Sequence, residues 1–154
     1  MLQGAVFQPV SGGGGGGGSS VTLVSAFSAA DQSIISSTAF TSATDLQLVL
    51  PSAGTYAIEG FITWFSNATA DLKIRFSGGT TLKWQGDWNR ATALTVGTAS
   101  LLCQGNNTAD RSTPIRGLIP VTGATTLQFQ FGQNVSTAVN TIIRANSWIY
   151  ALKL

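Results

Sequence analysis

The side chains that could carry out acid–base chemistry are few in this chain and widely spaced. It has six acidic residues, and no pair of them has the spacing of a catalytic motif. They are Asp31, Asp45, Glu59, Asp71, Asp87 and Asp110. Glycoside hydrolysis needs two opposed carboxylates, and no pattern in the sequence indicates that two of these meet. We interpret the aspartates as turn and cap residues. Glu59 lies within a predicted strand, where it should face out of the sheet or pair with Lys73 or Arg75 on a neighbouring strand.

Nucleophiles and metal ligands are equally scarce. The chain has no histidine, which excludes Cys–His catalysis and histidine metal sites. Its single cysteine, Cys103, cannot form an internal disulfide, and we interpret it as a small buried apolar residue. The Gly-x-Ser-x-Gly motif of hydrolases is absent. We therefore predict that the protein is not an enzyme and uses no cofactor or metal.

One cluster has the residue types of a binding site. In residues 83–90, KWQGDWNR, two tryptophans flank a turn that carries Asp, Asn, Gln and Arg. Sugar recognition uses aromatic faces with planar polar groups, and Trp and Arg are also enriched at protein–protein hot spots. The ordinary interpretation places Trp84 in the core and Trp88 against the loop. The alternatives are a subunit contact, which we favour, and a glycan site. The residues of such a site would be Trp84, Asp87, Trp88 and Arg90.

The composition limits the classes of partner. The chain has 154 residues, which suits one domain, and only 9% of them are charged. The usual charged share is about 25%, so the surface must consist mostly of Ser, Thr, Asn, Gln and Gly. Such a surface is common in proteins that pack against neighbours. The net charge of +2 is spread thinly, without a basic block, so we expect no nucleic-acid partner.

Membrane and export signals are not apparent. No apolar run reaches the roughly 18 residues that a membrane-spanning helix needs, so we expect no membrane partner. The first ten residues, MLQGAVFQPV, lack a basic segment followed by an apolar one, so we expect no secretion signal.

Residues 1–20 differ in composition from the rest of the chain. A short apolar head precedes seven consecutive glycines, Gly12–Gly18, and two serines. Gly/Ser tracts usually form flexible linkers. A phosphate-binding loop is excluded, because no Lys-Ser/Thr pair follows the glycines. We predict an extended arm that lies against another subunit or the surface carrying the domain. Its apolar anchors would be Leu2, Val6, Phe7 and Val10.

The stretch 46–65 is the predicted centre of a β core. Leucines alternate with other residues up to Leu50, Pro51 ends that strand, and Gly54 lets the chain turn into a second strand rich in large β-forming residues. Two further runs, 72–76 and 127–131, alternate strictly. The side chains predicted to point into the core are Leu46, Leu48, Leu50, Leu72, Ile74, Phe76, Leu127, Phe129 and Phe131.

The remaining pattern predicts an all-β jelly roll or β-sandwich of about eight to ten strands in residues 21–154. Short apolar runs alternate with Gly-rich turns, and no segment has a helical pattern. We expect one run over 93–103 and a final strand or strand pair over 140–154. The strand 115–121 should lie at a sheet edge, because Pro120 cannot donate to a ladder.

Two segments resemble a known family. Residues 50–56, LPSAGTY, with the alternating strand after them, resemble the strand that begins AGTY in C1q/TNF-like jelly rolls. The same pattern is frequent in small bacteriophage virion proteins. Residues 145–154, ANSWIYALKL, resemble the final strand of such phage proteins, which often ends on an apolar–x–Lys–Leu sequence. The resemblance extends over about residues 21–154 and has no counterpart for residues 1–20.

The resemblance implies a homotrimer with a role at the surface of a virion. Such domains are typically trimers used as capsid decoration proteins, head fibres or tail-fibre tips. Few charges and much apolar surface agree with a closed assembly, which removes that surface from water. We expect the C-terminal strand near the subunit interface, with the contact residues Trp148, Tyr150, Leu152 and Leu154.

Two functions remain open at this point. The first is a capsid decoration or cement protein, whose partners are copies of itself and the major capsid protein or another virion protein. The second is a tail-fibre or spike tip that binds host-surface glycan with Trp84 and Trp88. Length favours the first, because fibre proteins normally carry a long shaft of repeats, whereas 20 residues precede the domain here.

Overall fold

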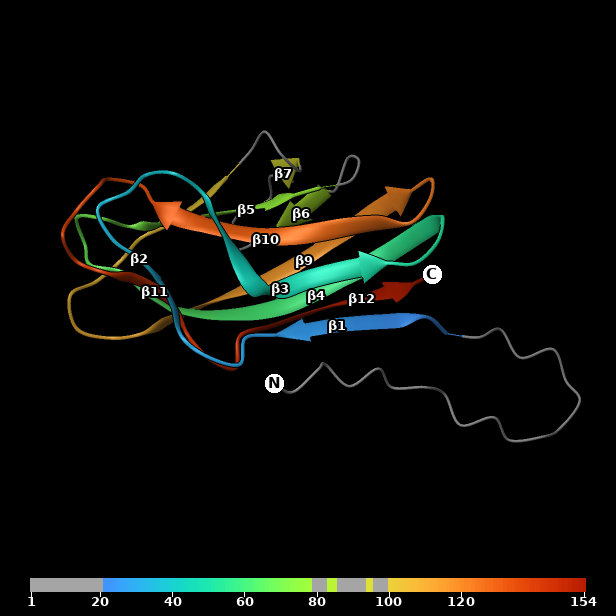
Figure 1. The fold of residues 1–154 in the computed structure, drawn as a ribbon, viewed down its shortest axis with the longest axis horizontal. Helices are drawn as coiled ribbons and strands as arrows, with labels where there is room; N and C mark the ends of the chain where they lie inside the picture. Colours follow the sequence, from blue (N-terminus) through green and yellow to red (C-terminus); the bar gives the residue numbers. More distant parts are fainter. Residues whose placement is uncertain (1–20, 79–82, 86–93, 96–99) are drawn as a thin grey trace, which may run out of the picture.

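The computed structural model describes residues 21–78, 83–85, 94–95 and 100–154, and these form an all-β sandwich (Figure 1). The large sheet contains β1 (Leu23–Phe27), β2 (Gln32–Ile34), β4 (Gly54–Phe65), β6 (Lys83–Gln85), β7 (Leu94–Thr95), β9 (Arg111–Val121), β11 (Thr141–Ile143) and β12 (Trp148–Lys153). The small sheet contains β3 (Thr41–Leu50), β5 (Leu72–Ser77), β8 (Leu101–Cys103) and β10 (Thr125–Gln133). The all-β prediction is confirmed.

All described strand pairs are antiparallel. The large sheet has the order β1-β12-β4-β9-β6-β7, with β11 pairing with β4 and β2 with β11, and the small sheet has the order β3-β10-β5-β8. The described residues form twelve strands, more than the eight to ten expected, because five of them have three residues or fewer. None of these residues forms a helix long and apolar enough to cross a membrane.

The corner at 51–53 joins the two sheets. β3 before it pairs with β10, whereas β4 after it pairs with β9 and β12. The corner is held by two hydrogen bonds: the Tyr56 hydroxyl donates to the Ser52 carbonyl at 3.1 Å, and Lys153 Nζ donates to Ser52 Oγ at 3.0 Å. The stretch predicted as the centre of the core therefore contributes a strand to each layer.

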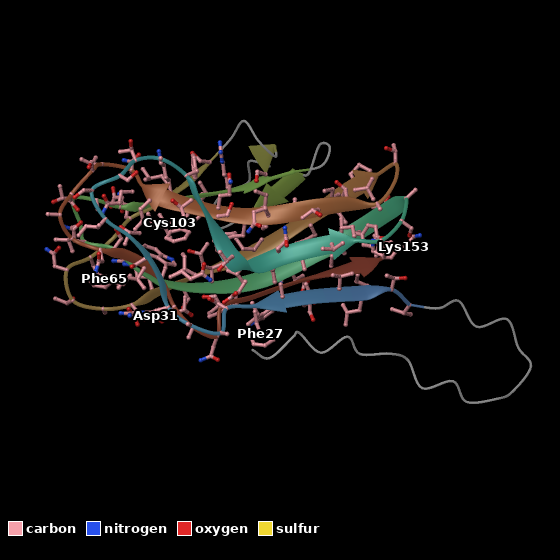
Figure 2. The ribbon with its side chains drawn as sticks, viewed as in Figure 1. Phe27, Asp31, Phe65, Cys103 and Lys153 are labelled. Carbon is pink, nitrogen blue, oxygen red and sulfur yellow. The ribbon has the colours of Figure 1, made fainter. Side chains whose placement is uncertain are left out.

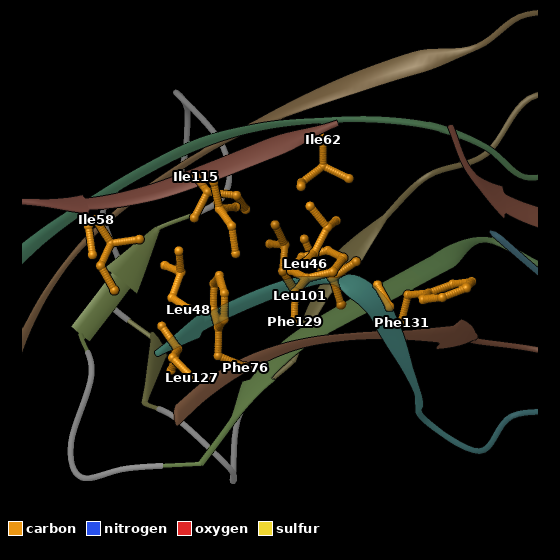
Figure 3. Close-up of a cluster of buried hydrophobic side chains, with 14 of the residues drawn as sticks. Leu46, Leu48, Ile58, Ile62, Phe76, Leu101, Ile115, Leu127, Phe129 and Phe131 are labelled. Carbon is orange, nitrogen blue, oxygen red and sulfur yellow. The ribbon is translucent and has the colours of Figure 1, made fainter. Parts of the chain in front are cut away.

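The core lies between the two sheets (Figure 3). Ile58, Ile62 and Ile115 of the large sheet face the small sheet's leucines and phenylalanines. All nine residues predicted to point inward are buried, so the strand register predicted from alternation is confirmed. Phe76 and Phe129 meet edge to face, with ring centroids 5.5 Å apart. Cys103 is also buried, as predicted, and its Sγ lies 3.7 Å from Thr113 Oγ1.

Two strand predictions need correction. The run expected over 93–103 is divided, because β7 belongs to the large sheet and β8 to the small one. The edge position expected for 115–121 is wrong, because β9 lies between β4 and β6. The described pairing of β6 with β9 spans only Arg116–Leu118, so Pro120 lies beyond it and interrupts no described rung with that strand.

We expect Gly78→Ala to destabilise the protein strongly. Gly78 has φ = 84°, which costs a residue with a Cβ on the order of 1–3 kcal/mol. A methyl group there would also overlap the carbonyl oxygen of Thr126. Gly123→Ala is the matched control, because nothing lies within 4 Å of its added methyl. Denaturant titration of both variants at one protein concentration checks this, and equal midpoints would contradict the expected strain.

Candidate interaction surface

Two of the acidic residues do meet in the structure, on either side of Arg144. Arg144 Nη1 lies 2.7 Å from Asp31 Oδ2, and its Nη2 lies 2.9 Å from Asp110 Oδ1 (Figure 2). The Arg144 Nε also donates to Asp110 Oδ1 at 3.0 Å, and the Ala145 N–H donates to Asp31 Oδ1 at 2.8 Å. This cluster ties together the loops before β2, before β9 and before β12.

The charges of this cluster do not suit hydrolysis. The hydrogen bond from the Ala145 N–H, together with the Arg144 guanidinium, lowers the pKa of Asp31 below its ordinary value. A glycosidase general acid needs the opposite shift, because it must stay protonated at the working pH. In the part of the chain that the structure describes, no three His, Cys, Asp or Glu side chains are grouped to hold a metal ion. We interpret the cluster as a structural clamp.

The tryptophan cluster and the arm fall largely outside the described residues. This applies to Asp87, Trp88 and Arg90, and to the arm anchors Leu2, Val6, Phe7 and Val10. Trp84 belongs to β6, where its backbone is in register with Gly117 of β9. The roles assigned to these residues from the sequence therefore stay predictions.

The outer face of the large sheet, which points away from the small sheet, carries two apolar rows. Cross-strand register aligns four strands, so residues from β1, β12, β4 and β9 stand side by side. The first apolar rung consists of Leu23, Leu152, Ala57 and Leu118. The second apolar rung consists of Phe27, Trp148, Phe61 and Pro114.

Large apolar side chains in these rungs remain open to solvent. Leu23 and Phe27 are each 57% exposed, and Leu118 is 51% exposed. Phe61 is 42% and Trp148 40% exposed in the centre of the second rung, and Figure 2 places Phe27 on β1 at the boundary of the sandwich. A contiguous exposed apolar surface on a soluble protein marks an interaction site. The outer face of the large sheet is therefore the candidate interaction surface.

The outer face of the small sheet has a different character. Its outward residues are mostly polar, and the longest of them are Gln47, Lys73, Arg75, Gln128 and Gln130. Lys73 and Arg75 both lie over the Phe40 ring, with Nζ and Cζ at 4.7 and 4.0 Å from its centroid. The two faces of the sandwich thus differ in polarity, and only the large sheet presents aromatic residues in adjacent strands.

A polar rung separates the two apolar rungs. It consists of Ser25, Tyr150, Glu59 and Arg116, aligned across the same four strands. The Tyr150 hydroxyl donates to Glu59 Oε2 at 2.5 Å, and the Tyr150 ring stacks on that of Trp148. Glu59 faces outward as predicted, but the predicted pairing with Lys73 or Arg75 is wrong, because those residues belong to the other sheet.

The C-terminal strand contributes to this surface as the sequence suggested. Trp148, Tyr150 and Leu152 alternate outward along β12, while Leu154 follows the strand and is exposed. Their assignment to a subunit interface stays a prediction. Sequence reasoning missed Leu23, Phe27, Phe61 and Leu118, although Phe61 could have been found from the alternation of β4, whose inward residues were recognised.

Known structures match this fold closely enough to define it. Murine APRIL has a TM-score of 0.54 at 9% identity, with 88% of this chain and 100% of that chain covered. The Eiger TNF from S. frugiperda has a TM-score of 0.51 at 8% identity, covering 87% and 92%. This is a TNF-like jelly roll.

The TNF-like jelly roll also matches a viral protein. The infectious bursal disease virus VP2 subviral particle has a TM-score of 0.51 at 12% identity, covering 87% of this chain and 32% of the VP2 chain. No family model and no curated protein matches the sequence. At these identities the likeness concerns the fold alone.

The Tyr150–Glu59 contact should be visible in an alkaline titration. The hydrogen bond to the Glu59 carboxylate, with burial, raises the pKa of Tyr150 above its ordinary value of about 10. A raised folded-state pKa stabilises the fold below that ordinary value, and this contribution is lost as pH rises through the raised one. Phenolate absorbance should therefore appear at lower pH in Glu59→Gln than in the parent. Superimposable curves would contradict the contact.

Proposed function

We propose that the protein is a structural component of a bacteriophage particle, a capsid decoration protein that forms a homotrimer and attaches through residues 1–20. The observation that carries this proposal is the pair of apolar rungs on the outer face of the large sheet. Burial of apolar side chains is the main driving force of stable association. A subunit built to be covered by its neighbours needs such a face.

Further support comes from the resemblance of the chain to phage virion proteins and from the fold that it has in common with a virus-particle protein. The polar outer face of the small sheet complements the apolar one, since a decoration protein keeps one surface in water while another is covered. The partners are copies of this chain and the major capsid protein or another virion protein. The location is the particle surface.

Particle association can be tested directly in lysates of the phage-producing source. Antibody against the chain should detect it in the density-gradient fractions that contain nuclease-resistant particles. Detergent-free washing should leave it bound to them. Recovery of the chain only from the soluble fractions would contradict a structural virion role.

The arm makes a second, separable test. Removing residues 1–18 should leave a folded domain, because the described strands all lie after residue 20. The shortened protein should no longer bind particles that lack the chain, whereas the full chain should bind them. Unchanged binding by the shortened protein would show that the arm is only a linker.

A further inference from the structure

The polar rung is unusual because it lies between two apolar rungs. Glu59 is half-buried in the isolated subunit, and its neighbours on β4 in the outer direction are Ala57 and Phe61. When a partner covers this face, the Glu59 carboxylate loses water and needs a compensating charge. A wholly apolar row at this position would avoid that cost, so the polar rung calls for a role.

The geometry holds Glu59 in a defined position. Tyr150 donates to one carboxylate oxygen, and the stacking of Tyr150 on Trp148, with ring centroids 5.7 Å apart, links that donor to the second apolar rung. The remaining acceptor positions of Glu59 are available for a second donor. Arg116 is aligned with Glu59 on the next strand and is exposed, so a guanidinium stands at the same level of the face.

The rung contains both signs of charge, which identifies the occupant. A face carrying only an acid or only a base would select a partner of opposite charge. A face that offers one of each can match a second copy of itself. In a cyclic trimer each copy presents different parts of its surface to its two neighbours, so an acid of one copy can meet a base of the next.

We propose that the polar rung sets the register of self-association, with Glu59 of one copy pairing with Arg116 of the neighbouring copy. This inference rests on the proposed assembly through the outer face of the large sheet. Two apolar rungs alone would permit the copies to slide by one rung. The polar rung forbids this, because a shifted copy would place Glu59 against apolar side chains without a donor.

Charge reversal tests the pairing. Glu59→Arg and Arg116→Glu should each raise the dissociation constant of the trimer at least tenfold, since each brings like charges together. The double variant should recover most of the loss, and mixing the two single variants should recover part of it. Lys73→Glu is the matched control on the outer face of the small sheet and should leave the dissociation constant unchanged.

Light scattering over a dilution series measures each dissociation constant, and circular dichroism with thermal melting shows that each variant is folded. Glu59→Gln and Arg116→Gln provide the same comparison if a reversed charge prevents folding, with weakening expected in both. A trimeric parent with unaffected single variants would overturn the register role alone. Recovery in the double variant without recovery in the mixture would place the pair within one chain and overturn it as well. A monomeric parent would instead overturn the proposed assembly.

Discussion

Replacing Phe61 with lysine should convert the assembled protein into monomers at micromolar concentration. Phe61 lies in the second apolar rung, aligned with Trp148 on one side and Pro114 on the other. Full burial of a phenylalanine contributes about 1.5–3 kcal/mol, and a lysine there would add the cost of a buried charge. Because about 1.4 kcal/mol is a tenfold change, we expect the dissociation constant to rise at least about a hundredfold.

Val49→Lys is the matched control for this experiment. Val49 is 57% exposed on a strand of the small sheet, so it is an apolar residue at least as accessible as Phe61 on the opposite side of the sandwich. Its replacement should leave the assembly intact. Light scattering of both variants gives the masses. Equal masses for the two variants would show that the large sheet's outer face is not where copies meet.

Replacing Phe129 with alanine should cost about 3–5 kcal/mol of unfolding free energy, the range for a fully buried phenylalanine. Phe129 has no solvent exposure and meets the edge of Phe76 between the sheets (Figure 3). The small sheet's position in the middle of the core leaves little room for neighbouring side chains to fill the cavity.

Denaturant titration measures this loss, and all samples must be at one protein concentration because assembly makes apparent stability depend on it. Val49→Ala, on the same sheet but facing solvent, should change the unfolding free energy by less than about 0.5 kcal/mol. A loss below about 1 kcal/mol for Phe129→Ala would mean that the core is packed differently from the described arrangement.

The inward faces were predictable from the sequence because they depend on local alternation. In β5, Leu72, Ile74 and Phe76 are buried while Lys73 and Arg75 are not, as a period of two requires. The corner after Leu50 was likewise readable, since Pro51 and Gly54 have specific backbone consequences. Where such residue-level constraints exist, strand limits and register follow.

The interaction surface depends on pairing between strands far apart in the chain, which no local pattern specifies. Phe61 meets Trp148 only because β12 pairs with β4, and Leu118 aligns with Ala57 only because β9 does. The error over Glu59 has the same cause, since its partner Tyr150 is 91 residues away. The clamp at Arg144 also gathers carboxylates from distant loops.

The mass of the full chain in solution tests the central claim most directly. If copies associate through the outer face of the large sheet, static light scattering at micromolar concentration should give three times the 15.9 kDa mass of one chain. The trimer should persist in moderate salt, because most of the buried contacts are apolar. A stable monomer under these conditions would contradict the claim.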